Sequence, residues 1–234
     1  SFFFRKSVAE LIAGRIGPTF ALAVSTIVVS VLLAVPLGVI AAWKQGAWID
    51  RLVMGFSVLG FSVPVFVIGY ALIYLLAIEL AWLPVQGYQP IAGGFAGFAA
   101  HLVLPTLTLS VIYIALIARI ARTSVLDVLA EDYIRTARAK GLSRRAILVR
   151  HALRNAAVPI VTVIGLGVAL LIGGVVVTES VFSIPGLGRL TVDAVLARDY
   201  PTVQAVILLF SCVYVLLNLA VDLSYLWLDP RIRY

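Results

Sequence analysis

The chain has 234 residues, of which 62% are hydrophobic and only 12% are charged, and its formal net charge is +7. A soluble domain usually carries roughly twice that charged fraction, so a soluble fold of this length is excluded and lipid must be the solvent. The basic residues lie in the gaps between apolar runs, which argues against a nucleic-acid-binding face. Cys212 is the only cysteine, so no disulfide can form within the chain, and we expect it to be a small buried residue.

The first eighteen residues predict an amphipathic helix. Apolar side chains recur among charged ones at helical spacing, at Phe4, Val8, Leu11, Ile12 and Ile16. This pattern is typical of a helix that lies on the membrane surface, and Pro18–Thr19 is expected to turn the chain into the bilayer. We therefore predict an external amphipathic segment at 1–18 and a transmembrane domain at 19–234.

Five runs are mostly apolar over about 20 residues, the length at which a helix crosses a bilayer. They lie at Phe20–Ala42, Leu52–Leu80, Leu102–Ala118, Ala156–Val177 and Val203–Leu226. A helix closes its backbone hydrogen bonds within the segment, as lipid requires, whereas a transmembrane barrel would need short alternating strands. The predicted fold class is an all-α polytopic membrane protein with five transmembrane helices in this chain.

Several residues inside these runs bear on helix shape and packing. Three prolines can each kink a helix: Pro36, Pro64 and Pro105. Three small residues spaced four apart favour close helix packing over a pore-facing role: Gly165, Ala169 and Gly173. Two acids, Glu79 and Asp222, fall near the ends of spans, and Asp222 is expected to be solvated or paired with Arg231 or Arg233.

The distribution of Lys and Arg predicts the topology, because cytoplasmic loops are enriched in both. Thirteen of the eighteen lie at Lys44–Arg51, at Arg119–Asn155 and at the C-terminal end, and five lie in the other gaps. The first three regions are therefore expected in the cytoplasm and Ser1 outside. This outside start, with Met54 as the only methionine, predicts a further helix upstream.

Residues 119–155 form a strongly basic polar insert between two predicted spans. Ser124 is expected to cap a helix that runs through Ala139, Gly141 to end it, and Ser143 to cap a second helix. Small and apolar side chains within this charged surface favour docking to a soluble partner over a role that only fixes topology. They are Tyr133, Thr136, Ala137, Gly141, Leu142 and Ile147.

The insert resembles the cytoplasmic "EAA" loop of ABC importer permeases, whose pattern is E-A-A-x3-G-x9-I-x-L-P. Three positions match that pattern: Ala137, Gly141 and Leu153. Four depart from it: Arg135, Thr136, His151 and Arg154. DYIRTARAKGLS is similar to the version in the dipeptide and oligopeptide permease subfamily, and so are residues 178–201 and the C-terminal VDLSYLWLDPRIRY.

The resemblance implies a type I ABC importer permease fold in the bacterial plasma (inner) membrane. It implies two homologous permease subunits, two ATPase subunits and an external substrate-binding protein, with di- or oligopeptides moved by alternating access. This chain would be a permease rather than an enzyme, and it would bind no cofactor, because ATP and Mg²⁺ would be held by the ATPase subunits.

Two sets of site residues follow from the same resemblance. The ATPase-docking residues would be Asp132, Tyr133, Thr136, Ala137, Arg138, Lys140, Gly141, Leu142 and Leu153. The external loop or gate candidates would be Phe182, Pro185, Gly186, Gly188 and Arg189. An ordinary loop between two spans is an equal alternative for the second set.

Other functions stay open. Importers of this class also serve glutathione and nickel complexes, and nothing in the spans chooses among these substrates. A nucleotide-independent channel or secondary transporter is a second class, although the buried ionisable residues of an ion-coupled carrier are scarce, and a structural scaffold is a third.

The chain holds no G-x-x-x-x-G-K-S/T phosphate loop and no Cys/His/acid cluster at metal-ligand spacing. An intramembrane serine protease would need Ser57 or Ser62 near a histidine, and His101 is expected at the outer rim.

Overall fold

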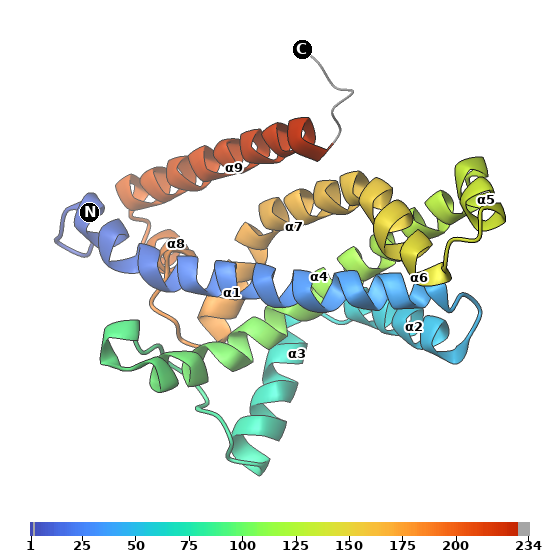
Figure 1. Ribbon diagram of the computed structural model, residues 1–234. Coiled ribbons are helices and arrows are strands. Elements are labelled where there is room, and N and C mark those ends of the chain that lie inside the picture. Colours follow the sequence, from blue (N-terminus) through green and yellow to red (C-terminus); the bar gives the residue numbers. More distant parts are fainter. Residues whose placement is uncertain (2, 229–234) are drawn as a thin grey trace. The chain divides into compact units, whose positions relative to one another are not determined.

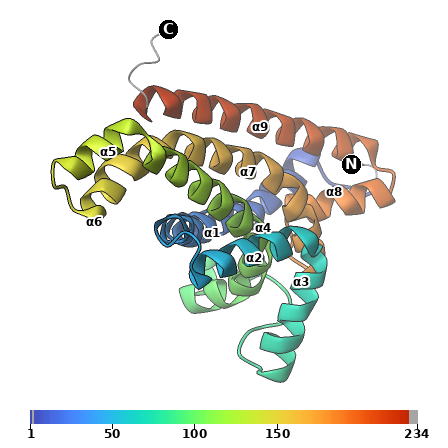
Figure 2. The same ribbon diagram turned by 90° about the vertical axis from the view of Figure 1, so that its right-hand side faces the viewer.

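The structure, a computed structural model, describes Ser1 and residues 3–228, and every regular element in that part of the chain is a helix (Figures 1 and 2). The α-helices are α1 (Val8–Trp43), α2 (Trp48–Ser62), α3 (Val65–Leu72), α4 (Phe95–Ala130), α5 (Asp132–Ala139), α6 (Arg144–Ala146), α7 (Leu153–Val181), α8 (Leu187–Leu196) and α9 (Tyr200–Leu228). Two π-helical segments, η1 (Ile73–Glu79) and η3 (Ile147–Ala152), and one 3-10 turn, η2 (Ile91–Gly93), complete the set. The all-α prediction is confirmed.

Within the described residues, four helices are long and apolar enough to cross a membrane, and α2 with α3–η1 makes a fifth span if this broken pair is counted as one. The five predicted runs coincide with these elements, so the multi-pass architecture is confirmed. The helices extend past the predicted ends, since α4 covers Phe95–Ala130 where the apolar run covers only Leu102–Ala118. A helix that continues into the interface keeps satisfying its own backbone groups, and apolar content alone does not mark where it ends.

The second predicted span is interrupted at Val63–Pro64. α2 ends at Ser62, and Pro64 has an extended ψ of 140° immediately before α3. Proline has no N–H to continue the helix, and its ring disfavours the helical conformation of the residue before it. By contrast, Pro105 lies inside the continuous helix α4. The predicted effect of proline on helix shape is therefore strongest at Pro64, where it ends the helix.

The predicted turn at Pro18–Thr19 is wrong, because α1 begins at Val8 and continues past Pro18 to Trp43. One proline costs a helix about 3 kcal/mol, but an interrupted backbone in an apolar solvent would leave more groups unpaired. The apolar side of the first segment contacts the protein itself. Leu11 is buried against Leu187 and Leu190 of α8 and Val206 of α9.

The chain divides into two compact units, each assembled from three separate segments. Unit 1 comprises Ser1–Val29, Val63–Val111 and Val168–Leu216, and unit 2 comprises Ser30–Ser62, Ile112–Gly167 and Leu217–Tyr234. The basic insert belongs to unit 2, and the segment that follows α7 belongs to unit 1.

The small-residue stripe predicted in α7 is confirmed at one of its positions. A Cβ added to Gly165 would lie 2.4 Å from Cγ2 of Val221, so α7 and α9 approach closely there. A Cβ added to Gly173 would meet no atom within 4 Å. The stripe therefore serves helix packing at Gly165. At Gly173, an added Cβ would contact none of the described residues.

Two expectations about single residues in α9 have different outcomes. Cys212 is exposed rather than buried, because the middle of α9 presents most of its side chains away from the rest of the chain. Asp222 is exposed, as expected of a solvated acid. Its predicted partners, Arg231 and Arg233, lie outside the described residues.

Candidate functional site

The basic insert folds as a hairpin of two short helical arms, which we define as residues 131–152 and call the basic hairpin. Figures 1 and 2 both show α5 lying beside α6. α4 ends at Ala130, Glu131 is extended with a ψ of 150°, and α5 starts at Asp132. The predicted cap at Ser124 is wrong, because Ser124 is buried inside α4. The apolar side chains of Val125, Leu126 and Leu129 keep packing past this serine, and that packing continues the helix.

The glycine turn of the hairpin is confirmed. Gly141 has a φ of +80°, a conformation that side-chain-bearing residues rarely adopt. Its N–H donates to the carbonyl of Arg138 at 3.0 Å, and the N–H of Leu142 donates to Ala137 at 3.2 Å. The predicted cap at Ser143 is also confirmed, because its Oγ accepts from the N–H of Ala146 at 3.3 Å.

The hairpin has a very small core of its own. Ile134, Ala137 and Ile147 are buried against one another, with Leu129 of α4 packed beside them. The first arm is also tied to the start of α7, because the Tyr133 hydroxyl accepts a hydrogen bond from Nδ2 of Asn155 at 2.5 Å. Ile134 was missed in the sequence, although its spacing of three from Ala137 places both on one helical face.

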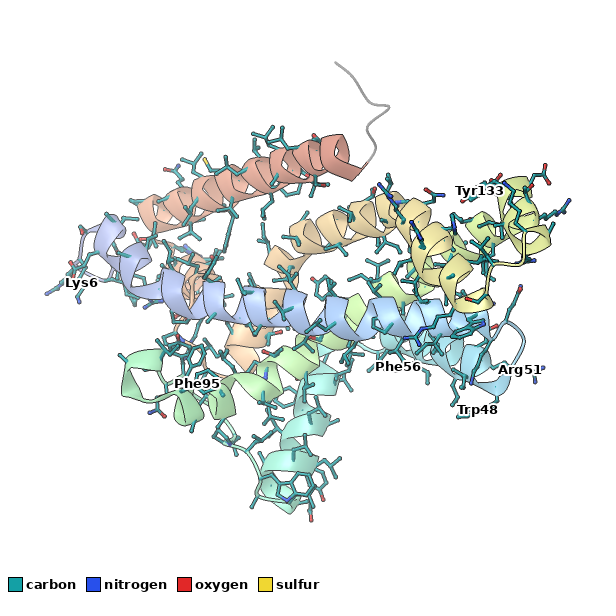
Figure 3. All side chains as sticks on the ribbon, in the orientation of Figure 1. Lys6, Trp48, Arg51, Phe56, Phe95 and Tyr133 are labelled. Carbon is teal, nitrogen blue, oxygen red and sulfur yellow. The ribbon has the colours of Figure 1, made fainter. Side chains whose placement is uncertain are left out.

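The predicted docking residues therefore fall into two groups. Ala137 faces the core of the hairpin, and Leu153 is half-buried against the cluster formed by α4 and α7. The remaining members are exposed: Asp132, Tyr133, Thr136, Arg138, Lys140, Gly141 and Leu142. Tyr133, 42% exposed, is labelled on α5 in Figure 3. The exposed group mixes basic, acidic, aromatic and small residues around one glycine turn.

A pocket of about 680 Å³ opens beside the hairpin. Its walls come from the end of α1, the end of α4 and both arms of the hairpin, and they include Trp43, Leu126, Leu129, Arg138, Leu142 and Leu148. The base of the hairpin is therefore only partly packed against the helices that carry it.

A second site is centred on Glu179, and we call residues 178–190 the Glu179 loop. The Glu179 side chain is fully buried near the end of α7. Its carboxylate accepts from the hydroxyl of Thr19 at 2.6 Å and from the N–H of Arg189 at 2.9 Å. The Thr19 hydroxyl in turn accepts from the N–H of Leu187 at 2.8 Å. The carboxylate thus pairs the free N–H groups at the start of α8, where negative charge is favoured.

Most of the predicted gate residues are buried in the interior of this loop. Two of them must be glycine, because other atoms lie where a side chain would begin. A Cβ on Gly186 would lie 2.0 Å from Oε1 of Glu179, and a Cβ on Gly188 would lie 2.7 Å from Cα of Val176. Phe182 is buried, and its carbonyl accepts from the N–H of Gly87 at 2.9 Å. Pro185 is exposed and Arg189 is half-buried. Only these last two side chains are available on the surface.

Sequence reasoning missed both Glu179 and Thr19. They are 160 residues apart in the chain, and no local pattern links them. One signal was present: an acid at the end of a span, a few residues before the glycine-rich PGLG.

Comparisons with known proteins show the family of the chain. The family of binding-protein-dependent transport system inner membrane components matches residues 34–234. The chain belongs to this family. It is 58% identical to a probable peptide ABC transporter permease of Sinorhizobium fredii over 97% of this chain and 72% of that protein. It is 46% identical to the glutathione transport system permease of Escherichia coli K12 over 98% of this chain and 72% of that protein.

Two solved structures share the fold. The inward-facing MetNI methionine ABC transporter gives a TM-score of 0.75 at 18% identity, over 94% of this chain and 97% of that chain. An amino acid ABC transporter crystallised with histidines gives 0.65 at 15% identity, over 96% and 95%. The protein is therefore a multi-pass inner-membrane permease subunit of an ABC importer. Among the described residues, no three His, Cys, Asp or Glu side chains come together as a metal site.

Proposed function

We propose that this permease translocates di- or oligopeptides that an external binding protein delivers. The 58% identical relative described as a probable peptide permease supports this substrate class. Glutathione is the second candidate, because the 46% identical relative belongs to a glutathione transport system. Nickel complexes, the third substrate of such importers, are supported by neither relative. Uptake of labelled dipeptide, tetrapeptide and glutathione by the complete transporter, each competed with the others, chooses among these substrates.

The proposed assembly contains a second homologous permease subunit, two cytoplasmic ATPase subunits that bind ATP and Mg²⁺, and the binding protein. The basic hairpin is the proposed contact with an ATPase subunit. The observation that carries this assignment is the exposed turn at Gly141, where a Cβ would meet no atom of the described residues within 4 Å. A partner can approach the backbone closely there, Leu142 adds exposed apolar surface beside the turn, and Tyr133 adds more at the start of α5.

The proposed mechanism is alternating access driven by the ATPase subunits. Closure of these subunits on ATP would displace the hairpin, and α4 and α7, which lead into and out of it, would carry the displacement into the membrane. The five predicted spans hold few ionisable side chains. This composition suits a pathway that lets a peptide pass without binding it tightly.

Gly141→Asp tests the docking assignment in the complete transporter reconstituted in lipid. The substitution should abolish uptake and the stimulation of ATP hydrolysis by loaded binding protein, while the protein still inserts in the membrane. Because any side chain at a φ of +80° also strains the turn, Gly94→Asp is the matched control. Gly94 has a φ of +116° and is equally free of neighbours, but it lies in the loop before α4. Docking is contradicted if both variants behave alike or if Gly141→Asp transports normally.

Gly141→Asn separates turn strain from partner contact. Asparagine tolerates a positive φ better than most residues, so this variant should insert and fold like the wild type. A side chain that the turn tolerates still occupies the space that a partner would need. We therefore expect Gly141→Asn to retain stability and to lose most of the ATPase stimulation.

A further inference from the structure

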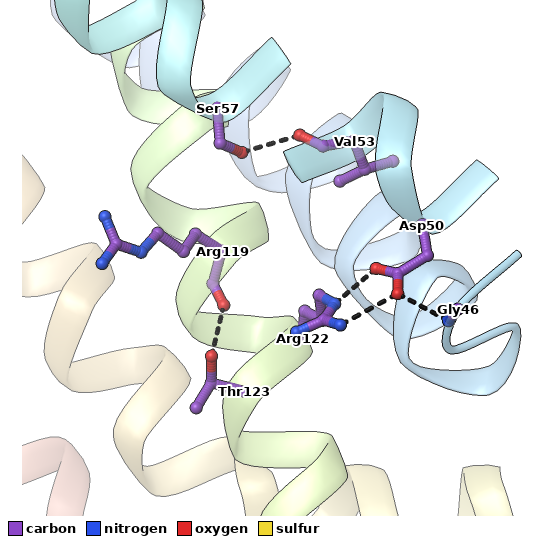
Figure 4. A network of polar contacts seen from close by, with 7 residues as sticks. All are labelled: Gly46, Asp50, Val53, Ser57, Arg119, Arg122 and Thr123. Carbon is purple, nitrogen blue, oxygen red and sulfur yellow. Dashed lines mark hydrogen bonds and ion pairs between the residues drawn. The ribbon is translucent and has the colours of Figure 1, made fainter. Parts of the chain in front are cut away.

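A buried ion pair joins three elements of unit 2 close to the basic hairpin. Asp50, in the first turn of α2, is only 4% exposed. Arg122 of α4 donates from Nε to Oδ1 at 2.5 Å and from Nη2 to Oδ2 at 2.9 Å. The N–H of Gly46, in the turn after α1, donates to Oδ2 at 2.9 Å. Figure 4 shows this network.

The Asp50–Arg122 pair fixes direction as well as neutralising charge. Two parallel N–H donors on one carboxylate fix the orientation of both side chains, which a single contact does not do. The third donor comes from Gly46, whose φ of +78° turns its N–H toward the carboxylate. The three donors therefore hold the start of α2 to α4 and to the end of α1 in one arrangement.

α2 has little else to hold it in this unit. Its buried positions form one narrow stripe: Asp50, Val53, Ser57 and Gly60. Only Val53 among them is a sizeable apolar side chain, and the Ser57 hydroxyl donates back to the carbonyl of Val53 within the helix. The opposite side is exposed, with Trp48 70% exposed at the start of α2 and Phe56 exposed about two turns later (Figure 3). The ion pair is thus the most specific tie between α2 and α4.

α4 is, in contrast, firmly joined to α1 and to the hairpin. A Cβ on Gly38 of α1 would lie 2.6 Å from the carbonyl oxygen of Ala118, so the two backbones are in direct contact. Two turns after Arg122, Leu129 packs on the core of the hairpin, and Val125 packs with Leu148 of its second arm. Any displacement of the hairpin therefore reaches Arg122 through packed side chains.

We infer that the Asp50–Arg122 pair is the joint through which the basic hairpin moves α2. Arg122 and Asp50 are positioning residues in this account, and the inference rests on the proposed coupling of the hairpin to an ATPase subunit. Without the joint, α4 would follow the hairpin while α2 would stay behind. ATP hydrolysis would continue, and it would no longer be converted into transport.

The first test measures substrate uptake and ATP hydrolysis in parallel, in the complete transporter reconstituted in lipid. Asp50→Asn and Arg122→Gln should each lower the uptake per ATP hydrolysed by about tenfold, the scale of effect expected of residues that carry coupling. Hydrolysis itself should change by less than about twofold.

Arg119 provides the matched control, because it lies one turn earlier on α4, its side chain is exposed, and it points away from Asp50 (Figure 4). Arg119→Gln should leave the ratio of uptake to hydrolysis unchanged. The inference is overturned if Asp50→Asn and Arg122→Gln keep the wild-type ratio, or if Arg119→Gln lowers it equally.

A covalent bridge tests whether the pair acts during transport or only during folding. In a Cys212→Ser background, Asp50→Cys and Arg122→Cys are joined after assembly in the membrane by a short bis-methanethiosulfonate reagent, which forms a reducible disulfide with each thiol and releases methanesulfinate. The bridged protein should transport with the wild-type ratio, and reduction should lower that ratio about tenfold. If the reduced protein stays coupled, or the bridged protein is uncoupled, the joint is rejected. This measurement holds even where Asp50→Asn does not fold.

Failure of this inference is distinguishable from failure of the proposed function. If the hairpin does not contact an ATPase subunit, Gly141→Asp leaves ATPase stimulation intact. If only the joint is wrong, Gly141→Asp abolishes stimulation and Asp50→Asn retains the wild-type ratio.

Discussion

The basic hairpin and the Glu179 loop are both short segments beside membrane-spanning helices, and they are built in opposite ways. The hairpin has a separate core of only three side chains and holds its polar contacts at the surface. The Glu179 loop places a carboxylate in its interior and surrounds it with backbone donors and two glycines. Buried polar contacts hold the Glu179 loop in one shape. The basic hairpin, which we propose docks to a partner, instead keeps most of its residues exposed and its core small.

Removal of the Glu179 carboxylate should produce the largest loss of stability. Glu179→Ala leaves the N–H groups of Gly188 and Arg189 and the hydroxyl of Thr19 without their acceptor. Each unsatisfied buried group costs about 1–3 kcal/mol, so the apparent Tm of the detergent-solubilised protein should fall by about 10 °C. Glu10→Ala is the control, since Glu10 is exposed and pairs only with Lys6 at the surface. Equal Tm values for the two variants would contradict the role of the buried carboxylate.

Gly188→Ala should produce the next largest effect, because the added Cβ would lie 2.7 Å from the backbone of Val176. Overpacking of this kind costs about 2 kcal/mol, which corresponds to about 6 °C in Tm. Gly173→Ala is the matched control in the same unit, since its Cβ would meet no neighbour and alanine favours the helix. A thermal shift assay should therefore show a lower Tm for the first variant and an unchanged or higher Tm for the second. A Gly188→Ala protein as stable as the wild type would show that the loop is not rigid.

Ile134→Ala should act locally, because Ile134 belongs to the small core of the hairpin. Truncation of a buried isoleucine costs about 2–5 kcal/mol. We expect a loss of this size to unfold the hairpin locally, because its core has only three buried side chains. Hydrogen exchange should speed up in α5, while the global Tm should change by less than about 2 °C, because Ile134 is not part of the cluster through which the second arm packs on α4 and α7. Val149→Ala in the second arm is the control, since Val149 is exposed. A large fall in global Tm would show that the hairpin is as firmly integrated as the Glu179 loop.

Tyr133→Phe should have the smallest effect. It removes the hydroxyl that accepts from Asn155 and leaves the exposed ring in place. A single exposed hydrogen bond contributes about 0.5–1.5 kcal/mol, so exchange in the hairpin should rise slightly and uptake should stay within about twofold of wild type. Asn155→Ala should match it, and the double variant should be no worse than either single one. An additive loss would show that the two residues act separately.

The sequence predicts those features that depend on local chemistry. Apolar length predicts the spans, and Gly141 and Ser143 predict the turn of the hairpin through backbone conformation and capping. Pro64 also acts locally and ends α2. The same local signals mislead at Pro18 and Ser124, because packing on either side continues α1 and α4 past residues that favour an end.

The features that the sequence does not predict are contacts between distant segments. Glu179 pairs with Thr19, and Asp50 pairs with Arg122 seventy-two residues later. Either acid on its own is equally compatible with a solvated position near the membrane interface. Only the folded arrangement shows that each is buried and which groups it accepts from.

The most direct test of the hairpin as the coupling element is site-directed cross-linking in the complete transporter. In a Cys212→Ser background, Leu142→Cys places a thiol on the exposed side of the hairpin beside Gly141, and Leu196→Cys places one on the exposed end of α8 as a comparison. Leu142→Cys should cross-link to an ATPase subunit, with a yield that changes when ATP is added, and Leu196→Cys should not. A Leu142→Cys protein that transports normally but forms no cross-link to an ATPase subunit would contradict the account.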